Sequence, residues 1–343
     1  MKTITANIKE GINQEIITEA GSILKDGGLV AFPTETVYGL GGNALDEQAA
    51  EKIYAAKGRP SDNPLIVHIA EFEALNKIAA EIPEEAKMLA DAFWPGPLTM
   101  IFQKTDLVPM GTTGGLNTVA VRMPDHPVAL ALIRAAGGYI AAPSANTSGR
   151  PSPTKAEHVI EDMDGKIEMI IDGGAVGIGV ESTIVDVSGE IPTLLRPGAI
   201  TIEMLRETLG QVDIDPVILG PVSGDIKPKA PGMKYRHYAP KAPVTVVTGD
   251  PEASARYIQT HLPEGAGVIC FTEYKDLFPG RSIHDLGPAA DKAEQARRVF
   301  DALREFDHEA VTEIYAQCPD TAGLGLAVAN RLKKAAGFHV IEV

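Results

Sequence analysis

A proline-rich segment near the middle of the chain sets the strongest limit on its fold. Within residues 210–243, prolines stand at positions 216, 221, 228, 231, 240 and 243. Proline fixes φ at about −65° and has no backbone N–H, so the segment opposes both a continuous helix and a central strand. We therefore predict two folded parts, residues 1–209 and 244–343, joined at 210–243 by an extended linker that is only loosely tied to its flanks.

The linker is also basic, in a chain that is acidic overall. Residues 221–243 contain five Lys or Arg and one carboxylate, while the net charge of the 343 residues is −15. The stretch 230–241 reads APGMKYRHYAPK, with two tyrosines and a histidine beside the cations. One interpretation is a solubilising hinge, because loops of mixed polarity are common. The aromatic residues and the histidine favour another, a strap that closes over an anionic ligand.

The rest of the composition describes a globular protein with enough apolar residues for two cores, since 44% of residues are hydrophobic and 22% are charged. The acidic balance argues against a broad surface for nucleic acid or anionic membranes, so any anion site must be local. Cys270 and Cys318 form no CxxC pair, and we predict two buried free thiols. No signal peptide or membrane helix is evident, so we expect a cytoplasmic protein without membrane contact.

The periodicity of residues 1–209 predicts an α/β domain. After Asn13, an N-cap residue, apolar side chains recur on one helical face as far as Leu24, and Gly27 ends that helix before a strand at 29–33. Because several late strands follow one another without a helix, the twisted sheet should be mixed, with antiparallel neighbours. Further helices are predicted at 46–57, 71–92, 126–136 and 201–209, and further strands at 65–69, 98–102, 118–123, 139–142, 169–172, 183–187 and 193–196.

The sequence after the linker has a different rhythm. Strand-like runs alternate there with helical stretches, which is typical of βαβ units and a parallel sheet. Residues 244–343 are therefore predicted to form a smaller, Rossmann-like α/β domain. The strands are expected at 244–247, 267–271, 312–316 and 338–343, and the helices at 251–262, 289–305 and 324–336.

Three loops of the first domain concentrate residues suited to ligand binding. Residues 33–42 combine hydroxyls with glycines, 57–65 place Lys and Arg at the end of a helix, and 142–152 bring hydroxyls, an amide and a glycine after a strand. Each loop has a purely local alternative: an ordinary turn, compensation of a helix dipole, or side-chain capping. Walker, Rossmann, HExxH and GxSxG patterns are absent, so the residues alone predict an anion-binding α/β enzyme.

Several motifs in these loops and strands occur together as they do in one known family. Five motifs resemble those of YrdC-like threonylcarbamoyl-AMP synthases. They are PTETVYGL at 33–40, KGRP at 57–60, SANTSG at 144–149, STIVD at 182–186 and RPG at 196–198. The linker motif and the second α/β part are similar to the longer, two-domain branch of that family. The resemblance implies a nucleotidyltransferase that condenses L-threonine, bicarbonate and ATP into threonylcarbamoyl-AMP and pyrophosphate, with magnesium (Mg²⁺) accompanying ATP.

The resemblance also implies roles for individual residues. A polar tetrad around the triphosphate and the reacting carbonate falls on Lys57, Arg59, Ser144 and Asn146. The contacts of threonine fall on Thr36, His68, Arg122, Ala142 and Ser182. The contacts of ATP fall on Arg59, Asn63, Thr118, Ser144, Ser152, Arg196 and one linker tyrosine, Tyr235 or Tyr238. No residue is implied as a direct metal ligand. The linker would then be a lid that brings Tyr235, His237 and Lys234 over a labile intermediate.

The family's product serves the threonylcarbamoyl modification of the adenosine beside the tRNA anticodon. The resemblance thus implies a transient partner, the downstream tRNA threonylcarbamoyl transferase complex, with direct tRNA binding weak or absent. Two alternatives stay open. One is a carbamoyl-transfer maturation enzyme of the hydrogenase type, although its cysteine-rich zinc modules are absent here; the other is a non-catalytic RNA-binding module, which the acidic charge disfavours. The role of residues 244–343 is not evident from the sequence.

Overall fold

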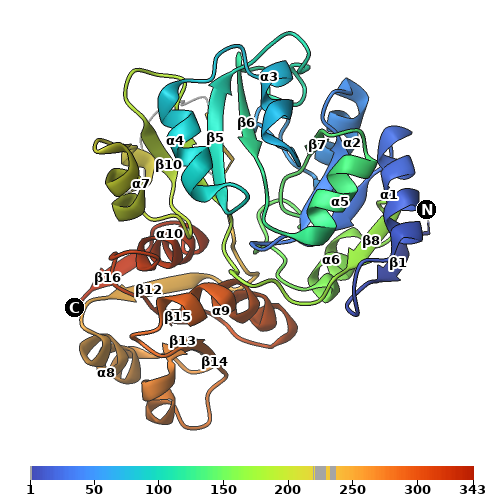
Figure 1. Ribbon diagram of the computed structural model, residues 1–343. Helices are drawn as coiled ribbons and strands as arrows, with labels where there is room; N and C mark the ends of the chain where they lie inside the picture. Colours follow the sequence, from blue (N-terminus) through green and yellow to red (C-terminus); the bar gives the residue numbers. More distant parts are fainter. Residues whose placement is uncertain (1, 219, 221–228, 232–236) are drawn as a thin grey trace.

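Two β-sheets organise the molecule (Figure 1). The computed structural model describes residues 2–218, 220, 229–231 and 237–343. Over these residues the first sheet has eleven strands in the order β1-β8-β2-β3-β7-β4-β6-β5-β9-β10-β11. Those strands are β1 Ile4–Asn7, β2 Val30–Phe32, β3 Gly39–Asn43, β4 Ile66–His68, β5 Leu98–Gln103, β6 Thr118–Arg122, β7 Ile140–Ala141, β8 Met169–Asp172, β9 Thr183–Asp186, β10 Thr193–Arg196 and β11 Asp213–Ile214.

The first sheet is mixed, as the sequence predicts. Strand β5 pairs antiparallel with β6 and parallel with β9, and β4 pairs parallel with β6 and antiparallel with β7. Helices pack on this sheet and shield a large apolar core that includes Leu40, Val67 and Met100. These helices are α1 Gln14–Lys25, α2 Glu47–Lys57, α3 Leu75–Ile78, α4 Glu84–Phe93, α5 Pro127–Ala135, α6 Ala156–Met163 and α7 Ile202–Leu209.

Helix α1 begins and ends where its capping residues predict. The Asn13 side chain accepts hydrogen bonds from the backbone N–H groups of Glu15 and Ile16, at 2.9 and 3.3 Å. Such a cap satisfies two of the first free amides of a helix. After Lys25 the chain turns through Gly27, whose φ of 76° suits a residue without Cβ.

Three predictions for this domain are wrong in detail. The single helix expected at 71–92 is a 3₁₀ turn at Phe72–Ala74, the short α3, and α4, which starts after Pro83. The first piece ends because Ala79 is extended and forms a β-bridge with Lys104. Pro83 disfavours helical backbone at Ile82, just before α4. Strand β3 was not predicted, because its glycine-rich sequence resembles a loop. Gly41 packs so closely that an added Cβ would lie 2.9 Å from Ile140, so only glycine fits there. Helix α6 was also missed.

The second sheet has five parallel strands in the order β14-β13-β15-β12-β16, which confirms the predicted Rossmann-like pattern. Its edge strand β14 was not predicted, because His284 and Asp285 interrupt the apolar run. Both cysteines lie buried here as free thiols, Cys270 on β13 and Cys318 directly after β15. The elements are β12 Val244–Thr248, α8 Pro251–His261, β13 Gly267–Phe271, β14 Ile283–Gly287, α9 Lys292–Glu305, β15 Ile314–Gln317, α10 Gly325–Ala335 and β16 Val340–Glu342.

Helices α9 and α10 lie between the two sheets and join the two domains (Figure 1). Val37 and Val180 of the first domain share one apolar cluster with Phe300 of α9 and Val328 of α10. Gly179 allows the close approach of α9, because its φ is 92° and an added Cβ would overlap the backbone of Ala296. The interface is therefore a continuous apolar core.

The described parts of the predicted linker are more tightly packed than expected. Strand β11, at Asp213–Ile214, extends the first sheet by pairing with β10. Ala230 is fully buried against Ile66 and Ile101. Tyr238 is 5% exposed. In the part of the chain that the structure describes, no helix has the length and apolar character needed to cross a membrane.

Candidate active site

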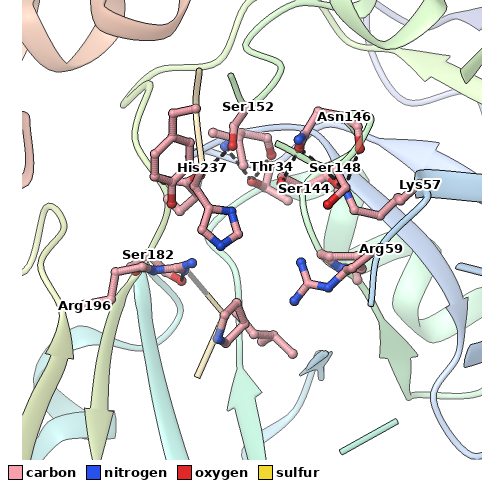
Figure 2. Close-up of a pocket in the computed structure, with 18 of the residues that line it drawn as sticks. Thr34, Lys57, Arg59, Ser144, Asn146, Ser148, Ser152, Ser182, Arg196 and His237 are labelled. Carbon is pink, nitrogen blue, oxygen red and sulfur yellow. Dashed lines mark hydrogen bonds between the residues drawn. The ribbon is translucent and has the colours of Figure 1, made fainter. Parts of the chain in front are cut away.

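A pocket opens beside the domain junction, and its walls come from both ends of the first domain's sequence and from the linker (Figure 2). Arg196 and Ser182 lie on one side, and Lys57 and Arg59 lie on the opposite side. The imidazole of His237 points between them. The described lining residues are Thr34, Val37, Gly39, Lys57, Arg59, Ile66, His68, Arg122, Ala142, Pro143, Ser144, Asn146, Ser148, Gly149, Arg150, Ser152, Glu181, Ser182, Arg196, Pro231, His237 and Tyr238.

Eleven of the fifteen residues singled out from the sequence line this pocket. Asn63, Thr118 and Thr36 do not, and Tyr235 falls outside the described residues. Thr36 is fully buried, with its hydroxyl 2.9 Å from that of Thr34, which does face the pocket. The eleven that line it are Lys57, Arg59, His68, Arg122, Ala142, Ser144, Asn146, Ser152, Ser182, Arg196 and Tyr238.

Lys57, the last residue of α2, ties that helix to the 144–149 loop. Its side chain is 2% exposed, and its Nζ donates to the backbone carbonyls of Ser144 and Asn146, the latter at 2.5 Å. Burial, helped by the nearby Arg59, lowers the pKa of this amine well below its usual value. The ammonium thus lies at the edge of the pocket with most of its hydrogen bonds directed to protein.

The 144–149 loop holds its own polar groups in place. The Ser144 hydroxyl donates to Asn146 Oδ1 at 2.5 Å, and Asn146 Nδ2 donates to the carbonyls of Thr147 and Arg150 at 2.9 and 3.0 Å. Both side chains therefore keep one orientation before any ligand arrives, which is the preorganisation that a site for a reacting group requires.

Two arginines enter the pocket from opposite sides on rigid supports. Arg59 donates to the carbonyls of Asn63 and Pro64, at 3.3 and 3.0 Å, so Asn63 orders this arginine through its backbone. Arg196 donates to the carbonyl and the hydroxyl of Ser182, at 3.0 and 3.1 Å. Burial lowers the pKa of each guanidinium to about 10, and both stay charged at neutral pH.

A third arginine and a neutral histidine lie next to each other on β6 and β4. His68 and Arg122 are register partners in the parallel pair. Burial, with a further contribution from Arg122, lowers the pKa of His68 to about 3. Its Nδ1 lies 3.1 Å from the Ile66 carbonyl, so the neutral ring donates there and leaves Nε2 as an acceptor. Arg122 Nη2 is 2.6 Å from Glu35 Oε1.

The linker contributes a second neutral histidine. Burial and the neighbouring Arg59 lower the pKa of His237 to about 3. The adjacent Tyr238 has φ of 65° and packs its ring on Phe300 of α9, with centroids 5.1 Å apart. The linker is therefore held over the pocket by a helix of the second domain.

Comparisons with known proteins bear on the whole chain. Residues 22–198 match a family model for Sua5, YciO and YrdC proteins that is described as telomere recombination, and residues 200–337 match the threonylcarbamoyl-AMP synthase C-terminal domain. The threonylcarbamoyl-AMP synthase of Pyrococcus abyssi is 52% identical over 99% of this chain and 100% of its own length. The chain belongs to the threonylcarbamoyl-AMP synthase family.

Other members of the threonylcarbamoyl-AMP synthase family agree with this. The Bacillus subtilis synthase is 50% identical over 96% of this chain and 95% of that protein. The crystal structure of Pyrococcus abyssi Sua5 complexed with L-threonine superposes with a TM-score of 0.94, at 50% identity, over 99% of this chain and 100% of that one. A putative synthase of Mycobacterium tuberculosis matches only 57% of this chain with 89% of its length, so the family also contains shorter members.

Several residues of this pocket were not singled out from the sequence, and one of them pairs with a residue behind the wall. Glu181 lines the pocket, and the buried Arg331 of α10 donates to it from behind at 2.8 Å. Glu181 directly precedes the STIVD motif, and its position next to that motif could have identified it as a pocket residue. Arg331 had no such signal, because nothing in its local sequence shows that α10 packs against residues 150 positions earlier.

Proposed function

We propose that this pocket is the active site in which the protein condenses L-threonine, bicarbonate and ATP into threonylcarbamoyl-AMP and pyrophosphate. The observation that carries the proposal is the convergence of basic side chains: Arg59, Arg122 and Arg196, together with the amine of Lys57, all line one pocket of a chain whose net charge is −15. Substrates with a carboxylate, a carbonate and a triphosphate need such a concentration of positive charge. The family's activity supplies the identity of those substrates.

The reaction proceeds in two steps that need no protein nucleophile. The threonine amine attacks the carbon of bicarbonate, the C–OH bond breaks, and the hydroxide leaves as water with a proton from the amine, which gives a carbamate. With CO₂ the same N–C bond forms and the amine loses a proton. A carbamate oxygen then attacks the α-phosphorus of ATP, and the bond to the bridging oxygen breaks to release pyrophosphate. Negative charge accumulates on the phosphates in the second step, so preorganised donors such as Arg59 and the Ser144–Asn146 loop stabilise its transition state.

We infer that threonine lies toward Arg122 and His68. Arg122 pairs with Glu35 through Nη2, and its Nε has no hydrogen-bond partner among the described residues. That remaining donor can bind the carboxylate of an amino acid, and such pairing is strong because the group is buried. His68 is neutral, so its Nε2 accepts a hydrogen bond from the hydroxyl or the amine of the substrate. The threonine bound in the Pyrococcus abyssi structure supports a threonine site in this family.

Magnesium and the downstream partner are part of the proposal. Among the described lining residues Glu181 is the one carboxylate, and Arg331 already pairs with it. Mg²⁺ commonly binds through substrate phosphates and one or two carboxylates, so we propose that it enters as the ATP chelate and neutralises the leaving pyrophosphate.

We propose that the product passes to a tRNA threonylcarbamoyl transferase complex in a transient contact, since a mixed anhydride hydrolyses in water.

The test is pyrophosphate release from ATP with bicarbonate, magnesium and each of the twenty amino acids in turn, with the nucleotide product weighed by mass spectrometry. We expect release with threonine alone and a product with the mass of threonylcarbamoyl-AMP. If no amino acid stimulates release, the synthase proposal fails for this pocket. A salt-dependent shift of tRNA in the same preparation would then favour the RNA-binding alternative.

A further inference from the structure

Glu181 stands out in the pocket because it is an acidic residue where anions are expected to bind. It is 6% exposed, lies on the segment just before β9, and has Oε1 2.5 Å from the hydroxyl of Ser152. A buried carboxylate destabilises the folded protein unless it is paired, and an unpaired one here would repel a triphosphate. The charge of Glu181 must therefore be compensated by the protein.

The cation that pairs directly with Glu181 comes from the second domain, and Arg196 of the first domain adds a smaller attraction. Arg331 of α10 has no exposed surface and does not line the pocket, yet its Nε donates to Glu181 Oε2 at 2.8 Å. Arg331 Nη1 donates in turn to Asn330 Oδ1 at 3.1 Å. One carboxylate thus links Ser152, on the pocket wall, to a helix that the first domain does not contain.

The same guanidinium also contacts the linker. The Cζ of Arg331 lies 5.6 Å from the centre of the Tyr238 ring, within the range of a cation–π interaction. Tyr238 lines the pocket and packs on Phe300 of α9 on its other side. Arg331 therefore contacts, directly or through Glu181, two residues on the predicted ATP side of the pocket.

The position of Arg331 is fixed independently of Glu181. Its neighbours Val328 and Leu332 are buried in the second domain's core. Asn330 Nδ2 donates to the carbonyl of Ile218 in the first domain at 3.3 Å. Because α10 is anchored on both domains, it fixes the position of the Arg331 guanidinium. The Arg331 side chain therefore loses little conformational entropy when ATP binds.

We propose that Arg331 is a positioning residue of the synthase reaction, which neutralises Glu181 and holds Ser152 and Tyr238 in their ATP-binding arrangement. This gives the second domain a role in the site: it supplies the counter-ion that lets a carboxylate remain among bound phosphates. The inference rests on the proposed function for the identity of the nucleotide, but its charge argument applies to the binding of ATP alone.

The experiment compares five full-length proteins: wild type, Arg331→Met, Arg331→Lys, the double variant Glu181→Gln with Arg331→Met, and the control Arg256→Met. Arg256 lies on α8 of the same domain with an exposed side chain, and its ion pair among the described residues is with Glu252 on its own helix. Each protein is measured for the Kd of ATP by calorimetry, for the KM values of ATP and threonine, and for thermal unfolding.

We expect Arg331→Met to weaken ATP binding about tenfold or more, because a buried charge loses its partner. The KM of threonine should change less than about twofold, since Arg331 touches nothing on the threonine side. Arg331→Lys should restore part of the affinity, and the double variant should bind ATP better than Arg331→Met, because removing Glu181's charge removes the repulsion.

Two results would overturn the proposal. One is an ATP affinity of Arg331→Met equal to that of Arg256→Met. The other is a double variant no better than Arg331→Met, which would mean that charge compensation is not the role of Arg331. If Arg331→Met does not fold, Arg331→Lys decides the same question, because an ATP affinity of Arg331→Lys equal to that of Arg256→Met would overturn the proposal. A wild type that binds ATP but makes no threonylcarbamoyl-AMP would refute the proposed function while leaving the ATP comparison valid.

Discussion

Lys57 illustrates how a single residue can act on a site through the backbone. Its ammonium donates to two carbonyls of the 144–149 loop and so fixes the loop that carries Ser144 and Asn146. A guanidinium is planar and carries its donors in a rigid fork, so arginine is a poor replacement for an ammonium that donates to two carbonyls of one loop.

We predict that Lys57→Met lowers the rate of pyrophosphate release about 10²–10³-fold, the usual effect of losing one preorganised donor. Lys57→Arg should fall in the same range. Lys52→Met, on the exposed face of the same helix, should change the rate less than about twofold. Steady-state assays with threonine present measure all three. A loss below about threefold in Lys57→Met would remove this residue from the mechanism.

The two buried histidines predict a dependence of stability on pH. Both His68 and His237 have a pKa of about 3 in the folded protein, below the ordinary value of 6.5. The unfolded chain therefore binds more protons than the folded one between these values, and folding stability must fall as the pH drops below about 6.5. Each histidine contributes up to about 1.4 kcal/mol per pH unit to this loss.

Urea unfolding at several pH values between about 6.5 and 5 measures this loss of stability. This pH range lies above the ordinary pKa of carboxylates, so their titration contributes little to the slope. In the variant His68→Gln the slope of unfolding free energy against pH should be lower by about 1.4 kcal/mol per unit. An unchanged slope would show that His68 is protonated in the folded protein. Neither histidine should produce an inflection of activity near pH 6.5, because both have a pKa of about 3 and stay neutral on either side of that pH.

At the scale of elements, Gly179 controls how close α9 comes to the first domain. Its φ of 92° disfavours any side chain, and a Cβ would overlap the backbone of Ala296 and Arg297. We predict that Gly179→Ala destabilises the protein by more than about 2 kcal/mol and lowers activity, because it separates α9 from the pocket loops. Gly280→Ala is the control, since Gly280 has φ of 75° with no atom within 4 Å of an added Cβ.

Thermal or urea unfolding compares the two glycine variants, and the control isolates the backbone strain of about 1 kcal/mol that both share. Equal losses in Gly179→Ala and Gly280→Ala would mean that the contact with α9 contributes nothing. A larger loss in Gly179→Ala would measure the cost of moving the helix.

The elements that sequence reasoning found are those whose own residues determine them. Helix α1 combines a cap, an apolar face and a glycine stop within fifteen positions, so no tertiary contact was needed to predict it. Strand β3 depends instead on its partners: its glycines form a strand because β2 and β7 accept a close neighbour, which local propensity does not show. The polar edge strand β14 was missed for a similar reason.

At the scale of the whole molecule, the two domains are joined by buried ion pairs. Arg304 of α9 is 1% exposed and donates to Asp162 and to the Pro151 carbonyl, both at 2.7 Å. Arg150 of the pocket loop bridges Asp162 to Asp307 just after α9. The second domain thus holds the loop that ends in Ser152.

We predict that Arg304→Met lowers the free energy of unfolding by about 3 kcal/mol, because it leaves part of the charge on Asp162 buried without its partner. The exposed Arg297→Met on the same helix should cost less than about 0.5 kcal/mol. Guanidinium chloride unfolding of both variants provides the comparison. Equal midpoints would show that the interdomain pair does not stabilise the fold.

In the candidate site, too, the residues within sequence motifs could be predicted, whereas those brought together by contacts between the domains could not. The motifs around Lys57, Ser144 and Ser182 led to residues that line one pocket. Thr36, Thr118 and Asn63 were implied by the same resemblance but do not line this pocket, since a sequence motif does not specify which of its side chains face a ligand. The pairing of Glu181 with Arg331 arises only when two domains pack, and no local pattern contains it.

The two thiols of the second domain can be used to measure how often that domain opens. Cys270 and Cys318 are both buried, and burial raises the pKa of each to about 12, so neither is reactive in the closed structure. Any modification by a thiol reagent then requires that the five-stranded sheet open to solvent. The rate at which Cys270 and Cys318 react with such a reagent therefore measures how often this sheet opens. Because Arg331 of the same domain pairs with Glu181 in the pocket wall, the thiol reaction also reports on the domain that supports the pocket.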